Sequence, residues 1–272
     1  MPQKPKLGQN LLVDAHAVER IINGLGAGLG DLSGRTVVEI GPGRGAITGA
    51  LAARAGRVIA IELDRDFAAG LRGQFDPQHG PPERVTIVEQ DVLQFDFAAA
   101  AAEAGERLRV VGNLPYYITS PILLKLATSH AALDVAVLMV QREVAERVTA
   151  APGSRDYGLL SVTVQMYGPA EQLFTLPPSA FSPPPNVHST VFRWRFAPRF
   201  AELRVDEDGF LRFLRQAFAQ KRKTLNNNLR AAGVAPAVAA AALASAGIAA
   251  QARAEAVPVE ALAALWRALD SR

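Results

Sequence analysis

The stretch TVVEIGPGRGAI, residues 36–47, decides the fold class. Its first five residues are a short run rich in Val and Ile, which is typical of a strand covered on both faces. Three glycines follow within five residues, and a helical pattern begins at Ala46. Glycines there let the backbone turn tightly and let a ligand approach the main chain. The stretch therefore predicts a ligand-binding turn between a buried strand and a helix.

The same alternation continues on both sides of this stretch. Short apolar runs predict strands, and the amphipathic segments between them predict helices. The predicted strands are 36–40, 57–61, 85–88, 108–111 and 135–140, and the predicted helices are 14–25, 46–54, 66–72 and 121–128, the last introduced by Thr119 and Ser120 as cap residues. Strands and helices in alternation predict right-handed crossovers and a parallel, doubly wound sheet.

Two later runs, 160–167 and 190–196, have no long helix between them and are predicted to close the sheet as an antiparallel edge pair. The expected fold is therefore α/β, with a mainly parallel, seven-stranded, Rossmann-like sheet. From about residue 200 the apolar residues, Phe210 and Phe213 among them, recur at helical spacing. We predict one domain over residues 1–200 and a small all-helical domain over residues 201–272.

Composition narrows the class of protein. The chain has 49% hydrophobic and 20% charged residues, as expected of a soluble globular protein. It has no cysteine and four scattered histidines, so we expect neither disulfides nor a metal site. The N-terminus lacks the apolar stretch of a secretory signal. The uncharged segment 231–250 is mostly alanine, interrupted by glycine and proline, and is expected to form two short packed helices. We expect a cytoplasmic protein without a membrane span.

Charge is distributed unevenly along the chain. Residues 1–182 hold 16 Lys and Arg against 19 Asp and Glu, whereas residues 183–272 hold 13 against 7. A basic C-terminal portion on a slightly acidic body predicts a polyanionic partner met mainly from one side, although a solvated Arg-rich face gives the same count.

Two carboxylates follow the glycine-rich turn at the expected distances. Glu62 ends the second predicted strand, 21 residues after Gly41, and suits the hydroxyls of a ribose. Asp91 follows the third strand, where a carboxylate can accept a hydrogen bond from an adenine amino group. The pattern Gly41-x-Gly43-x-x-Ala46 also satisfies the relaxed dinucleotide fingerprint. These residues alone leave both S-adenosylmethionine and NAD open.

The segment Asn113-Leu114-Pro115-Tyr116 follows the fourth predicted strand, at the sheet edge where open α/β folds bind ligands. An adenine amino group is a poor nucleophile because its lone pair is delocalised into the ring. The Asn113 side-chain oxygen and the Leu114 carbonyl are two acceptors for its hydrogens, and they favour a pyramidal nitrogen facing a sulfonium methyl. Pro115 stiffens the loop, and Tyr116 offers a face for a base to stack on.

With these motifs in order, the sequence resembles the KsgA-type small-subunit ribosomal RNA adenine dimethyltransferases over nearly its whole length. The motifs that carry the resemblance are GQNLLVD at 8–14, EIGPGRGAIT at 39–48, IELDRD at 61–66, GNLPY at 112–116, QREVAERV at 141–148, YGLLSV at 157–162, VQMY at 164–167, PPSAFSPPPNVHS at 177–189 and QKRKTLNNNL at 220–229.

The resemblance implies S-adenosylmethionine as methyl donor and dimethylation of two adjacent adenosines in a hairpin loop near the 3′ end of 16S rRNA, within an immature 30S subunit. It implies that Asn113 touches both cofactor and target amine, and that Phe181 sandwiches the flipped adenine opposite Tyr116. The cofactor-binding residues that we carry over, besides Asn113, are Asn10, Leu12, Glu39, Gly41, Gly43, Glu62 and Asp91. A monomer is the default expectation.

Four positions depart from the family pattern. Tyr117 stands where the family usually has Asn, and Leu11 replaces a common Phe. Asn186 and His188 replace a usual Lys and Asp, which removes a basic residue from a segment that could face RNA.

Two basic clusters are candidates for RNA contact. Lys221, Arg222 and Lys223 place three phosphate-binding cations in a row. The second cluster interleaves arginines with aromatic residues over 193–200, and strand alternation there makes Trp194 and Phe196 core residues rather than base-stacking ones.

Three other functions stay open on sequence alone. A large-subunit RNA adenine methylase that confers macrolide resistance shares the glycine turn and the Asn-x-Pro-Tyr loop. An assembly factor that binds immature subunits needs no turnover, although the intact loop favours catalysis. An NAD-dependent oxidoreductase fits the glycine turn but leaves residues 113–116 unexplained.

Overall fold

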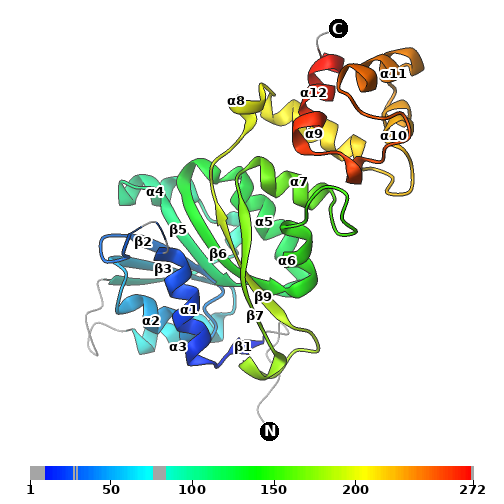
Figure 1. Ribbon diagram of the computed structural model, residues 1–272. Helices are drawn as coiled ribbons and strands as arrows, with labels where there is room; N and C mark the ends of the chain where they lie inside the picture. The colour runs from blue at the N-terminus through cyan, green and yellow to red at the C-terminus, as the bar shows by residue number, and fades with distance from the viewer. Residues whose placement is uncertain (1–9, 27, 29, 76–83, 271–272) are drawn as a thin grey trace. The chain divides into compact units, whose positions relative to one another are not determined.

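A computed structural model describes residues 10–26, 28, 30–75 and 84–270 of the chain (Figure 1). The chain forms two compact units: one comprises Met1–Ala145 and Ala170–Phe196, the other Glu146–Pro169 and Ala197–Arg272. The chain enters the second unit for good after Phe196, close to the boundary predicted at residue 200. Residues 146–169 also belong to the second unit, and no change in composition marks this stretch in the sequence.

The first unit is built on a seven-stranded sheet, as predicted, in the order β4-β3-β2-β5-β6-β9-β7. The first five strands of this order are parallel to one another, and β9 runs antiparallel to both of its neighbours, β6 and β7. The strands are β2 (Thr36–Ile40), β3 (Arg57–Glu62), β4 (Val85–Glu89), β5 (Leu108–Asn113), β6 (Leu133–Gln141), β7 (Ala170–Leu176) and β9 (Ser189–Arg195).

The strand order reverses between β2 and β5. Strands β3 and β4 lie on one side of β2, whereas β5 and β6 lie on the other. In an open α/β sheet a crevice forms at such a point, beyond the carboxyl ends of the two strands. Because Ile40 pairs with Gly112, the glycine-rich turn after β2 and the loop after β5 leave the sheet side by side.

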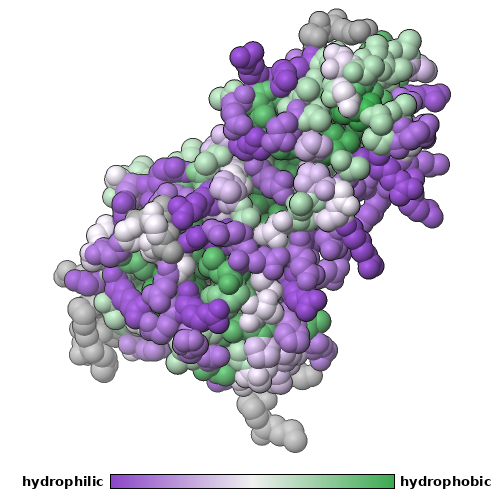
Figure 2. Space-filling view, in the orientation of Figure 1, coloured by the Kyte–Doolittle hydropathy of each residue, from purple (hydrophilic) through white to green (hydrophobic). Residues whose placement is uncertain are grey.

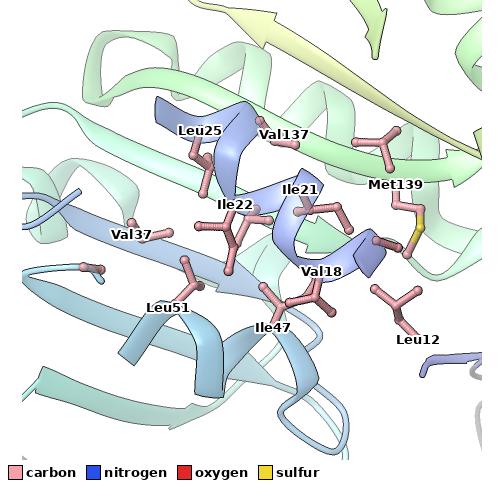
Figure 3. Close-up of a cluster of buried hydrophobic side chains, with 14 of the residues drawn as sticks. Leu12, Val18, Ile21, Ile22, Leu25, Val37, Ile47, Leu51, Val137 and Met139 are labelled. Atoms are coloured by element: carbon pink, nitrogen blue, oxygen red, sulfur yellow. The ribbon is translucent and has the colours of Figure 1, made fainter. Parts of the chain in front are cut away.

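Helices of the first unit cover the sheet on both faces (Figure 1). They are α1 (Ala15–Gly26), α2 (Ala46–Ala52), α3 (Arg65–Gln74), α4 (Phe97–Ala104), α5 (Thr119–Thr128) and the start of α6 (Arg142–Val148). Figure 3 shows α1 laying Val18, Ile21, Ile22 and Leu25 against apolar side chains of α2 and of the sheet. This is the apolar face that the spacing of those residues predicts.

One predicted strand is a helix. Residues 160–166 of the predicted run lie in α7 (Leu159–Met166), and the partner of β9 at the sheet edge is β7. A short apolar run buried on all sides does not distinguish strand from helix by periodicity. The local signal was Ser161, whose hydroxyl accepts a hydrogen bond from the Gly158 N–H at 3.0 Å and so begins a helix. Strand β7 was missed because it lies at the sheet edge, is half exposed and contains polar residues, so it lacks the continuous apolar run that predicted the other strands.

Two further expectations need correction. Helix α5 begins at Thr119, and the Thr119 hydroxyl donates to the Pro115 carbonyl at 3.1 Å instead of accepting as a cap. Segment 231–250 holds one helix, α11 (Pro236–Ser245), rather than two. The preceding helix, α10 (Leu225–Ala231), ends as the segment begins, where Gly233 takes a positive φ of 94°.

A short antiparallel ribbon holds the first described residues of the chain beside the crevice. Strand β1 (Leu11–Leu12) pairs with β8 (Phe181–Ser182), so that Leu12 lies opposite Phe181. The Val13 N–H extends the ladder by donating to the Ala180 carbonyl at 2.9 Å. Segments far apart in sequence are therefore held together beside the crevice.

The second unit is helical. Besides α7, α10 and α11 it contains α8 (Phe200–Leu203), α9 (Glu207–Ala217) and α12 (Val259–Asp270). Asp206 caps α9 by accepting from the Gly209 N–H at 2.7 Å, and Phe210 meets Trp266 edge to face. Exposed alanines give α11 a pale green surface in Figure 2, whereas the turn between α9 and α10 is strongly hydrophilic. Of the helices that the structure describes, none has both the length and the apolar character that crossing a membrane requires.

Gly112 allows the close approach of β5 to β2, which generates a stability prediction. A Cβ added there would lie 2.8 Å from the Ile40 carbonyl oxygen, which is backbone and cannot rotate away. We expect Gly112→Ala to destabilise the protein by about 1–3 kcal/mol, the usual cost of overpacking a core. Thermal denaturation followed by circular dichroism measures the change.

The matched control is Gly49→Ala in α2, where an added Cβ meets nothing within 4 Å. This variant should be as stable as the parent or stabler by up to about 1 kcal/mol, because alanine restricts the unfolded chain. Equal melting temperatures for the two variants would contradict the packing account.

Candidate active site

The glycine-rich turn after β2 is closely packed. Gly41 and Gly43 have φ values of 66° and 57°, which side chains other than glycine rarely adopt. A Cβ on Gly43 would lie 2.7 Å from the Leu11 side chain, so a larger residue there would have to displace that side chain as well as adopt the positive φ. The Gly41 N–H donates to the Ile61 carbonyl at 2.9 Å, which ties the turn to β3.

Glu62 supports this turn from the end of β3. One of its carboxylate oxygens accepts from the Gly43 N–H at 3.0 Å, and the other accepts from the Asp64 N–H at 2.9 Å. The side chain is only 1% exposed, so both bonds compensate for burying its charge. Asp91 follows β4, and one of its oxygens accepts from the Leu93 N–H at 2.9 Å.

Two neighbouring pockets open at the carboxyl edge of the sheet, with about 410 and 390 Å³ of empty volume. Gly41 and Pro115 line both of them. The first, which we call the loop pocket, is further lined by Asn10, Leu11, Gly43, Asn113, Leu114 and Tyr116. The second, which we call the carboxylate pocket, is further lined by Ile40, Ile61, Glu62, Leu63, Gln90, Asp91, Val92, Tyr117, Ile118 and Ile122.

Asn113 is the last residue of β5, and its side chain is fixed. Its amide nitrogen donates to the Asn10 carbonyl at 2.8 Å, which assigns the amide group its orientation. The side-chain oxygen is the only atom of this amide that can accept a hydrogen bond, and Asn113 lines the loop pocket. The next residue, Leu114, is anchored by its N–H to the Met139 carbonyl at 2.9 Å, and its side chain is buried.

The rest of the loop is stiffened by short contacts. The Pro115 carbonyl accepts from the Ile118 N–H at 3.2 Å and from the Thr119 hydroxyl at 3.1 Å. Tyr116 is half-buried, lines the loop pocket, and its phenol oxygen lies 2.8 Å from the Ser189 hydroxyl oxygen. The Pro115 carbonyl and the Tyr116 ring are therefore held in place by hydrogen bonds.

Glu39 does not line either pocket, unlike the other residues carried over from the glycine-rich turn. It is 1% exposed and accepts a hydrogen bond from the Thr48 hydroxyl at 2.6 Å, so it supports α2 from behind the turn. Burial raises the pKa of the Glu39 carboxyl from its ordinary 4.5 to about 8; the Thr48 bond lowers this pKa and the Glu62 carboxylate raises it further.

Leu12 and Phe181 are also placed away from the two pockets. They are 6% and 3% exposed and belong to the same buried hydrophobic cluster as Val18 and Met139. Asn10 and Leu11 border the loop pocket in their place. A stack of adenine between Tyr116 and Phe181 requires the Phe181 ring to be uncovered when the base enters, and it stays a prediction.

Sequence reasoning missed most residues that line the carboxylate pocket, among them Leu63, Gln90 and Tyr117. Leu63 and Tyr117 are 49% and 60% exposed, which is high for large apolar side chains. Leu63 and Gln90 directly follow β3 and β4, so their position at strand ends was the signal that could have found them. Tyr117, noted only as a departure from the family pattern, lies at this pocket.

The two basic clusters differ in how their side chains are engaged. The three side chains of the turn 221–223 are exposed, and the Asn228 amide holds the turn by donating to the Ala217 carbonyl at 2.7 Å. In the second cluster, Arg193 is paired with Glu171 at 2.6 Å, and Arg199 with Glu202 and Glu260, both at 2.9 Å. Trp194 and Phe196 are buried, as predicted.

A doubly wound sheet with a glycine-rich turn and an Asn-Leu-Pro-Tyr loop meeting at its switch point defines a methyltransferase that uses S-adenosylmethionine. The model of the family Ribosomal RNA adenine dimethylase matches residues 2–270, and the chain belongs to this family. The residues present fit the cofactor: positive-φ glycines leave room for close approach, and two carboxylates face one pocket.

Relatives agree with this assignment. A ribosomal RNA small subunit methyltransferase A from Acidobacterium capsulatum is 60% identical over 269 residues, which cover 99% of this chain and 92% of that protein. The protein of the same name from Koribacter versatilis is 49% identical over 278 residues, covering 98% and 94%. The resemblance to KsgA-type enzymes is thereby confirmed.

Solved structures support the fold. A dimethyladenosine transferase from Plasmodium falciparum aligns with a TM-score of 0.76 at 23% identity, covering 94% of this chain and 95% of that one. The 23S rRNA methyltransferase ErmE aligns with a TM-score of 0.71 at 24% identity, covering 96% and 100%.

The buried Glu39 carboxyl generates a prediction about pH. The folded protein keeps this group protonated up to about pH 8, whereas an ordinary carboxyl ionises near 4.5. Between these values the folded state binds more protons than the unfolded state, so its stability falls as pH rises. Glu39→Gln is neutral at every pH and lacks this loss.

We therefore expect the free energy of unfolding of the parent, minus that of Glu39→Gln, to decrease as pH rises from the ordinary carboxyl pKa of 4.5 to about 8. Urea denaturation at several pH values measures it. A difference that stays constant across this range would show that Glu39 is ionised in the folded protein.

Proposed function

We propose that this chain uses S-adenosylmethionine to dimethylate N6 of two adjacent adenosines in the 3′-terminal hairpin loop of 16S rRNA. It acts in the cytoplasm, as a monomer, on an immature 30S subunit. One observation carries the proposal: the Asn113 amide is held by the Asn10 carbonyl at 2.8 Å in a pocket that also contains Tyr116. Family membership supplies the class of RNA substrate.

The two pockets divide the work of binding. In our proposal the carboxylate pocket holds the nucleoside part of the cofactor, with Glu62 accepting from the ribose hydroxyls and Asp91 from the adenine amino group. Glu62 suits this role because it is already fixed by two backbone N–H groups and loses little side-chain freedom on binding. The loop pocket, with Asn10, Gly43 and Asn113, holds the methionine part and the target amine.

For methyl transfer the protein has to make a weakly nucleophilic amine reactive. The Asn113 side-chain oxygen and the Leu114 carbonyl accept the two hydrogens of the adenine N6 amine, which opposes delocalisation of its lone pair into the ring. S-adenosylmethionine, when bound, supplies an electrophilic methyl group. Tyr116 stacks on the extruded base, and the proton released from the amine passes to water, so no strong general base is needed.

Residues 201–272 form, in our proposal, an RNA-binding domain whose contact is the turn Lys221–Arg222–Lys223. Thr224 caps the following helix by accepting from the Asn227 N–H at 3.3 Å, and the Lys223 N–H donates to the Gln220 carbonyl at 3.0 Å. A preorganised turn loses little entropy when it binds. Three exposed cations on it suit phosphates of the RNA backbone.

The direct test of this function treats ribosomal subunits from a deletion strain with purified protein and labelled cofactor. Mass spectrometry of their 16S and 23S rRNA then locates the label. We expect dimethyladenosine at two adjacent 16S positions. Label in 23S rRNA alone would indicate a large-subunit methylase instead, and binding to subunits without any label would indicate an assembly factor.

Asn113→Ala removes one acceptor for the target amine. We expect kcat to fall by roughly 10²–10³-fold, as when one preorganised hydrogen bond to a reacting group is removed. Single-turnover methylation of unmodified 30S subunits measures the change. Asn23→Ala, on the exposed face of α1, is the control and should keep parental activity. An Asn113→Ala enzyme with unchanged kcat would remove the basis of the mechanism.

Replacing Lys221, Arg222 and Lys223 by alanine should weaken RNA binding. The slope of log affinity against log salt should decrease by up to about 3, since each phosphate-binding cation accounts for about one unit. Cofactor affinity should hold. The control replaces Arg35, Arg54 and Arg57, which removes the same charge from side chains already paired with glutamates. Equal salt slopes for the two triple variants would refute a specific role for the turn.

A further inference from the structure

Ser189 is joined to the loop after β5 through the phenol of Tyr116. The two hydroxyl oxygens lie 2.8 Å apart, and the residues are 73 positions apart in sequence. Tyr116 lies in a short 3-10 turn (Tyr116–Ile118), with its ring half-buried at the loop pocket. A hydrogen bond to the phenol oxygen can fix the orientation of the ring, because it restricts both side-chain torsion angles.

Ser189 is a rigid support for such a contact. It is 0% exposed and begins β9, between β6 and β7. Its backbone lies opposite Gln141 on one side and Leu176 on the other, so two strands hold its position. A hydroxyl mounted inside a sheet moves less than one on a loop, and it can therefore define where the phenol oxygen stays.

We propose that Ser189 is a positioning residue for methyl transfer: through the Tyr116 hydroxyl it sets the plane of the ring on which the target adenine stacks. The inference rests on the proposed function, because it needs a base to enter the loop pocket. A small error in the placing of a reacting group costs a large factor in rate, so a loosened ring should slow methyl transfer without altering cofactor binding.

A purely structural role makes different predictions. A buried serine needs a hydrogen-bond partner, and Tyr116 satisfies that need whether or not a base ever stacks on it. In that case removal of the bond lowers stability and leaves kinetics alone. The two roles are separated by measuring the KM for RNA and kcat beside the melting temperature.

The experiment is a double-mutant cycle with Ser189→Ala and Tyr116→Phe, assayed on unmodified 30S subunits. Each single variant removes the same hydrogen bond and keeps the aromatic ring. We expect each to lower kcat/KM for RNA by about 5–20-fold, while the Kd for S-adenosylhomocysteine, measured by calorimetry, stays within about twofold. The double variant should be no slower than either single one, because one bond is broken in all three.

Thr190→Val is the matched control. Thr190 is the next residue of β9, equally buried, and its hydroxyl oxygen lies 2.9 Å from that of Thr175. This substitution should lower the melting temperature but leave kcat/KM unchanged. If Ser189→Ala does not fold, Tyr116→Phe alone decides: a decrease of about 5-fold or more in kcat/KM supports the proposal.

Parental kcat/KM in the folded single variants, or decreases that multiply in the double variant, would overturn the positioning role. The proposed function fails separately, and visibly, if the parent enzyme itself places no label on 16S rRNA.

Discussion

The hydrogen bond from the Asn113 amide nitrogen to the Asn10 carbonyl, at 2.8 Å, is the constraint on which the site depends. An asparagine side chain at the end of a strand is otherwise free to present either its donor or its acceptor to a pocket. The bond to Asn10 takes up one N–H of this amide, and in the proposed mechanism the oxygen of the same amide accepts an N–H of the target amine. In that mechanism the orientation of one amide decides whether the crevice can hold the amine.

Three segments that are distant in sequence cooperate to keep that amide in place. The segment around Asn10 is held by the pairing of β1 with β8, the loop after β5 is anchored through Leu114 to β6, and Tyr116 is tied to β9 through Ser189. Each of these anchors involves a strand, which suits the proposed mechanism because that mechanism depends on placement rather than on an acid or a base. The buried, uncharged state of Glu39 serves the same end by supporting the helix behind the glycine-rich turn.

The sequence predicted the parts of this arrangement whose cause is local. Glycines at positive φ, Val- and Ile-rich strands and the Asn-Leu-Pro-Tyr loop each carry their reason in neighbouring residues, and the parallel sheet follows from their alternation. Features set by tertiary packing were missed. An apolar run around Val162 is equally suited to strand and helix until its surroundings bury it. No residue next to Glu39 in sequence reveals that the Thr48 hydroxyl donates to the Glu39 carboxyl group. Phe181 lies in β8, which pairs with β1, and β1 is far from Phe181 in the sequence.

A crystal structure of the protein with S-adenosylhomocysteine and an oligonucleotide that carries the target adenosine tests the central claim most directly. The account predicts that the Asn113 side-chain oxygen and the Leu114 carbonyl oxygen both lie within about 3.2 Å of the adenine N6, with the Asn113 nitrogen still on the Asn10 carbonyl. An Asn113 amide that turns its nitrogen toward the base, or an adenine bound with N6 directed away from both oxygens, would contradict it.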